Sequence, residues 1–95
     1  MTKIGTFDIK ESFNITLRGI VLVGYCNNCI PKTGMWVSLI LRDRIEIFKI
    51  TGISMGNRPK DNKDQFGLLI QTTSATKEYI SENKINNHSA ELLQE

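Results

Sequence analysis

The sequence predicts an all-β protein, a small closed antiparallel barrel of about six strands. Apolar and polar residues alternate with a period of two through much of the chain, and β-branched residues are frequent. Turn-forming residues interrupt the apolar segments at short intervals, and no convincing 3.6-residue period appears before residue 70. A sandwich has similar signals, but closure into a barrel removes the exposed strand edges that so many short strands would otherwise present.

The strands are expected where this alternation is clearest. In chain order, the segments are FDI (7–9), FNITL (13–17), IVLVGY (20–25), MWVSLIL (35–41), RIEIFKITGI (44–53) and FGLLIQ (66–71). Turns are expected at Asn27-Asn28, at residues 32–34 and at Arg42-Asp43. The stretch MGNRPKDNKDQ (55–65) contains glycine, proline and several charges, so it predicts a long loop.

The C-terminal part is less regular. SATKEYISEN (74–83) predicts one or two helical turns, capped by Ser74 or Thr76 and stopped at Asn83. A short strand over 84–86 would then complete a barrel domain of residues 1–86. Residues 87–95 are expected to form a C-terminal tail, either a short helix or a frayed end.

The alternation also predicts which side chains face inward. The expected core consists of Ile9, Phe13, Ile15, Val21, Val23, Val37, Leu39, Ile47, Ile50, Ile53, Leu68 and Ile70. Burial of each would contribute on the order of 1.5–3 kcal/mol.

Composition bounds the class of protein. The chain has 95 residues, 40% hydrophobic and 23% charged, with a net charge of +2, which is too balanced to predict nucleic-acid binding from bulk charge. Its apolar runs are too short to span a membrane, and its first residues do not form a secretory signal. We therefore expect a cytoplasmic protein with reduced thiols and no membrane partner.

Four motifs in this order resemble a known domain. The first is F-x-I-x-x-R-G-x-V-x-x-G, carried by Phe13, Ile15, Arg18, Gly19, Val21 and Gly24. KITGISM (49–55), DQFGLLIQ (64–71) and KEYISENKI (77–85) follow. Together they resemble the second domain of translational GTPases, the β-barrel of elongation factor Tu and its relatives, over about residues 7–86.

The resemblance implies a binding role in translation, on RNA or the ribosome. In elongation factor Tu, the segments that match residues 10–13 and 64–66 line the pocket for the acceptor end of tRNA, which makes Lys10, Glu11, Phe13, Asp64 and Gln65 candidate binding residues. Lys10 replaces an acid that is usual there. The alternative is that Phe13 belongs to the core and Glu11 to the surface.

The GTPase domain of the family is missing from this chain. No G-x-x-x-x-G-K-[ST] phosphate loop is present, so no nucleotide is expected to bind. The chain therefore resembles a free-standing relative, or an excised or diverged copy of the barrel. The alternative is a protein-interaction or structural module that kept the fold and lost the RNA role.

Basic residues offer a second candidate surface. They are Arg42 and Arg44 in one turn, and Arg58, Lys60 and Lys63 around the long loop. Such residues track a phosphate backbone in RNA-binding proteins, although the interspersed acids equally suit a solvated loop. Tyr25, Trp36 and Tyr79 would stack bases if they were exposed together.

No catalytic constellation is evident, so we expect neither an enzyme nor a cofactor. The one histidine, His88, lies in a polar stretch, and the carboxylate pairs Asp43/Glu46 and Asp61/Asp64 lie in or beside charged turns.

Cys26 and Cys29 form the one C-x-x-C motif. They would flank a two-residue hairpin turn at Asn27-Asn28, as free thiols in a cytoplasmic chain. Zinc would need two more ligands from a dimer or a partner, and a redox dithiol is the third alternative.

Overall fold

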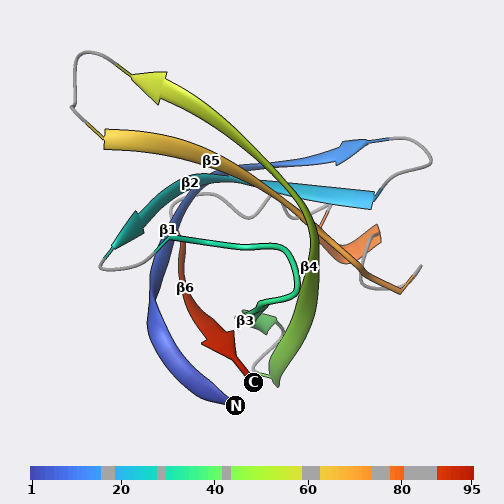
Figure 1. Cartoon of the computed structure of the whole chain (residues 1–95). Coiled ribbons are helices and arrows are strands. Elements are labelled where there is room, and N and C mark those ends of the chain that lie inside the picture. The colour runs from blue at the N-terminus through green and yellow to red at the C-terminus, as the bar shows by residue number, and fades with distance from the viewer. Residues whose placement is uncertain (16–18, 28–29, 42–43, 59–62, 74–77, 81–87) are drawn as a thin grey trace.

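The chain folds into a closed barrel of antiparallel strands. The computed structural model describes residues 1–15, 19–27, 30–41, 44–58, 63–73, 78–80 and 88–95. Within them the strands are β1 (Thr2–Ile15), β2 (Gly19–Asn27), β3 (Trp36–Leu41), β4 (Arg44–Arg58), β5 (Lys63–Ile70) and β6 (His88–Gln94). Their order around the wall is β1-β2-β5-β4-β3-β6, and β6 pairs with β1 to close it (Figure 1). The predicted fold class is confirmed.

The core fills the inside of this barrel. Its buried residues are Phe7, Ile9, Ile20, Leu22, Met35, Val37, Leu39, Leu41, Phe48, Ile50, Phe66, Leu68, Ile70, Ile80, Ala90 and Leu92. Of the predicted inward residues, Ile9, Val37, Leu39, Ile50, Leu68 and Ile70 are buried, and Ile53 packs against the core from a half-buried position.

Five of the predicted inward residues lie on the outer wall instead. Phe13 is 50% exposed, Ile15 40% and Ile47 45%, while Val21 and Val23 are half-buried.

A β-bulge explains this difference in β1. Ile9 is opposite Gly24 in β2, but the next pair is Glu11 with Val23, so Lys10 is an extra residue in the ladder. One inserted residue moves every following side chain to the other face. Phe13 and Ile15 therefore point outward, although they are odd-numbered residues of β1 like the buried Phe7 and Ile9.

β4 and β5 extend well beyond the barrel. Their pairing continues from Met55 opposite Phe66 to Arg58 opposite Lys63, and this two-stranded arm projects from the wall (Figure 1). The prediction of a loop over 55–65 is therefore wrong for most of these residues. Residues 55–65 do not alternate between apolar and polar types, so this segment lacks the period-two signal that identifies strands elsewhere.

The C-terminal residues are part of the barrel. β6 lies between β1 and β3, with Ala90 and Leu92 buried, so the predicted tail or short helix over 87–95 is wrong. Residues 78–80 are helical, with Ile80 buried, within the predicted helical segment. The predicted caps, the stop at Asn83 and the strand at 84–86 lie outside the described residues. Among the residues that the structure describes, no helix is long and apolar enough to cross a membrane.

Residues 30–35 lead from β2 to β3 across one end of the barrel (Figure 1). Pro31 and Met35 are buried there. The Met35 N–H donates to the Lys32 carbonyl at 3.2 Å, and Gly34 has φ of +97°, so the predicted turn at 32–34 is confirmed.

Candidate binding surfaces on the outer wall

The inside of the barrel offers no polar chemistry within the described part of the chain, because none of the buried side chains there is polar or charged. Small barrels are commonly filled by their own side chains in this way. Binding residues must therefore be sought on the outer wall and at the ends of the barrel.

The first candidate surface is the wall formed by β1, β2 and β5. Val23 of β2 has Glu11 of β1 on one side and Gly67 of β5 on the other. Residues 11–13 pair with residues 21–23 of β2, whereas residues 65–66 pair with residues 24–25. The two segments thus lie on opposite sides of the same strand, at adjacent positions along it. We call residues 10–13 and 64–66 the β1/β5 surface.

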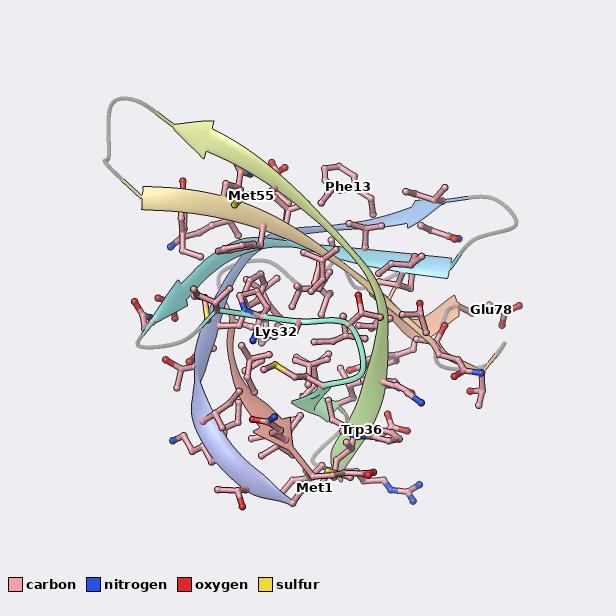
Figure 2. All side chains as sticks on the ribbon, in the orientation of Figure 1. Met1, Phe13, Lys32, Trp36, Met55 and Glu78 are labelled. Carbon is pink, nitrogen blue, oxygen red and sulfur yellow. The ribbon has the colours of Figure 1, made fainter. Side chains whose placement is uncertain are left out.

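The side chains of the β1/β5 surface differ in exposure. Lys10 and Glu11 are exposed, and Figure 2 shows Phe13 on the outside of the wall. Glu11 is therefore a surface residue, as the alternative interpretation held, but Phe13 is not a core residue. Gln65 is half-buried, and the backbone of Asp64 pairs with Asn57.

Among the basic candidates whose backbone the structure describes, Arg44 lies apart from Arg58 and Lys63. Arg44 begins β4 and Arg58 ends it, so they lie at opposite ends of a 15-residue strand. Arg58 and Lys63 are opposite each other at the end of the arm. Arg42 and Lys60 lie outside the described residues.

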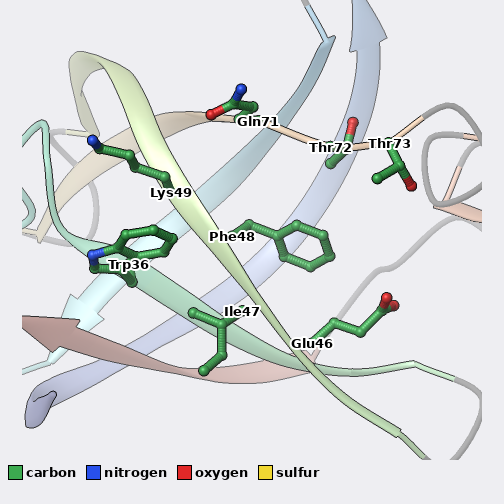
Figure 3. A pocket seen from close by; sticks show the side chains of 8 residues that line it. All are labelled: Trp36, Glu46, Ile47, Phe48, Lys49, Gln71, Thr72 and Thr73. Carbon is green, nitrogen blue, oxygen red and sulfur yellow. The ribbon is translucent and has the colours of Figure 1, made fainter.

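A second candidate surface is a cavity where β4 and β5 separate. Their ladder reaches Ile50 opposite Ile70, and one further bond joins the Gln71 N–H to the Lys49 carbonyl at 3.0 Å. The cavity has a volume of about 410 Å³ and is lined by Trp36, Glu46, Ile47, Phe48, Lys49, Gln71, Thr72 and Thr73 (Figure 3). We call it the wedge pocket.

The wedge pocket combines aromatic rings with polar side chains. Trp36 and Lys49 lie at one end of it, Thr72, Thr73 and Glu46 at the other, with Phe48 between them (Figure 3). The Lys49 ammonium is 5.9 Å from the centre of the Trp36 ring. Because Lys49 is exposed, this cation–π contact contributes only about 0.5–1 kcal/mol.

The pairing of Trp36 with Lys49 could have been predicted from the turn expected at Arg42-Asp43, although we did not derive it. A two-residue turn at Arg42-Asp43 makes Leu41 and Arg44 partners, and the same register places Trp36 opposite Lys49, as observed. The cavity itself could not have been predicted in this way, since it depends on where β5 leaves β4.

The predicted trio of stacking aromatics is not brought together. Trp36 lies on β3, whereas Tyr25 lies on β2, whose neighbours are β1 and β5. Tyr79 packs against the core cluster. Of these three aromatic residues, Trp36 is the one that lines the wedge pocket.

A third surface is apolar. Ile40 and Ile45 are opposite each other on the outer face of β3 and β4, 69% and 70% exposed, and Ile47 follows on β4. We call these three residues the isoleucine patch.

The cysteine motif does not form the predicted hairpin. β2 pairs with β1 and β5, and Cys26 is opposite Phe7 of β1. Cys26 is disulfide-bonded, which corrects the expectation of a free thiol and removes its sulfur as a zinc ligand. Asn28 and Cys29 lie outside the described residues. Among the described residues, no group of three or more His, Cys, Asp or Glu is placed to hold a metal ion.

Comparisons with protein-family models, with curated proteins and with solved structures found no match to this chain.

Proposed function

We propose that this protein is a non-catalytic binding module of the translation-factor barrel type that associates with RNA or the ribosome. The arrangement of the β1/β5 surface carries the proposal. Residues 10–13 and 64–66 are far apart in the sequence, yet they lie on opposite sides of β2 at adjacent positions along it. These are the segments whose counterparts in elongation factor Tu line the acceptor-end pocket.

The exposed side chains of this surface suit RNA. Phe13 offers an aromatic ring that is half exposed, and aromatic rings on a barrel wall stack unpaired bases. Lys10 is exposed at the bulge and supplies a positive charge for a phosphate. The closed barrel is compatible with the translation-factor domain, as it is with other small barrels.

Binding to labelled single-stranded RNA and to ribosomal subunits, measured at increasing salt, tests the proposal. We expect binding that weakens steadily as salt rises, because phosphate contacts release counterions. Lys10→Glu should weaken it and reduce the salt slope by about one. Lys10→Arg keeps the positive charge at the same position and should have little effect. Absence of binding to both probes at the lowest salt would contradict the proposal.

The isoleucine patch favours a second function, a protein-interaction module. An exposed apolar cluster of this kind often marks a contact with another protein. A partner that co-purifies after nuclease treatment, and is lost with Ile45→Asp, would support this function in place of RNA binding.

A further inference from the structure

We infer that the wedge pocket binds one nucleotide of single-stranded RNA, with the base stacked on Trp36 and the phosphate at Lys49. This inference rests on the proposed RNA-binding function and adds a site distinct from the β1/β5 surface. The cavity of about 410 Å³ lies within the range of small-ligand sites, roughly 300–1,000 Å³. It therefore has room for one unpaired nucleotide.

The Trp36 ring is placed where a base could stack on it. Trp36 is half-buried, so its ring is held in the wall while part of it remains accessible. Phe48, a core residue that is only 7% exposed, also lines the cavity. The Lys49 side chain now lies over the Trp36 ring. A base can displace it, since stacking of a base on an aromatic ring is a stronger contact than an exposed cation–π pair.

The polar part of the pocket complements the rest of a nucleotide. When the Lys49 side chain moves off the ring, its backbone remains opposite Trp36. Its ammonium group is then close enough to act as a point charge for the phosphate. Across the cavity, Gln71 presents an amide, and Thr72 and Thr73 carry hydroxyl groups. Amides pair with base edges, and hydroxyl groups pair with the ribose 2′-OH.

Trp36 is the only tryptophan of the chain and lines the wedge pocket, so tryptophan fluorescence reports on the surroundings of this side chain. The experiment titrates the full chain with a short oligouridine RNA and follows both Trp36 fluorescence and the anisotropy of labelled RNA. We expect saturable quenching with the same midpoint as the anisotropy change. We also expect weaker binding of the corresponding DNA, and equal affinity for DNA would overturn the assignment of a ribonucleotide.

Two pairs of variants separate stacking from a structural effect. Trp36→Leu should weaken binding about tenfold, while Trp36→Phe, which keeps an aromatic ring, should restore most of it. Lys49→Gln should reduce the salt slope by about one, while Lys49→Arg, which keeps the positive charge at the same position, should not. Circular dichroism confirms the fold of each variant, and Lys49→Gln tests the pocket even if Trp36→Leu does not fold.

The outcomes distinguish this inference from the proposed function. If RNA binds but leaves Trp36 fluorescence unchanged, and Trp36→Leu and Lys49→Gln bind as the unmodified chain does, the pocket assignment is overturned and RNA binding elsewhere stands. If neither RNA nor ribosomal subunits bind at the lowest salt, the proposed function is overturned and this inference with it.

Discussion

At the scale of single residues, two glycines are required for different reasons, one for close packing between strands and one for its backbone conformation. Gly24 lies in β2 where the chain passes very close to β1, and a Cβ there would overlap the backbone carbonyl of Asp8 and lie 3.1 Å from the Cα of Ile9. Gly34 has open space around it but a φ of +97°. The sequence predicted a turn at residues 32–34, and the φ of Gly34 confirms it.

Alanine at these two positions should therefore have unequal effects. Gly24→Ala should lower the free energy of unfolding by more than about 3 kcal/mol, because only backbone movement can relieve the overlap. Gly34→Ala should cost about 1–2 kcal/mol, the price of a left-handed conformation for a residue with a Cβ. Urea denaturation measures both, and equal losses would contradict the distinction.

At the scale of elements, β6 shows how a short strand depends on its neighbours. Its seven residues, HSAELLQ, contain three apolar side chains, which is too weak a pattern to distinguish a strand from a frayed tail. Pairing with β1 and β3 makes it a strand and directs Ala90 and Leu92 inward. The bulge at Lys10 likewise depends on a neighbouring strand, because it is defined only by the register between β1 and β2.

Adjacent leucines of β6 provide a matched test of this assignment. Leu92 is fully buried, whereas Leu93 is half-buried on the outer side. Leu92→Ala should destabilise the protein by about 2–5 kcal/mol, and Leu93→Ala should cost clearly less. The measurement is chemical denaturation of both variants beside the unmodified chain. If residues 88–94 were a frayed tail, neither substitution would change the unfolding midpoint.

At the scale of the whole molecule, closure makes each strand depend on two others. Every strand of the barrel pairs on both sides, and β1 and β6, at opposite ends of the chain, pair with each other. Loss of one strand would open the wall on two sides, so no part of the barrel keeps its core by itself.

We therefore expect one cooperative unfolding transition. Trp36 fluorescence reports on the β3–β4 wall, and far-ultraviolet circular dichroism reports on all strands. Their denaturation curves should superimpose, as in other single domains of this size. Separate midpoints would show that the β3–β4 wall unfolds independently of the rest.

One candidate site was indicated by the sequence, and the other was found only in the structure. Family motifs directed attention to residues 10–13 and 64–66, and the barrel places both beside β2. The motifs did not indicate the outward orientation of Phe13, because a bulge leaves no mark in the alternation of residue types. The wedge pocket was missed altogether, although the hairpin register would have placed Trp36 opposite Lys49.

The sequence by itself determined the all-β class, most of the strands that line the core and the turn at 32–34. These features depend on local alternation and on single residues, which one stretch of chain contains in full. Only the tertiary structure decided which face Phe13, Ile15 and Ile47 occupy, that residues 88–94 close the barrel, and where β5 leaves β4 to form the wedge pocket. The physical reason is that register, bulges and closure arise from hydrogen bonds between strands distant in the chain, and a period of two is the same in either register.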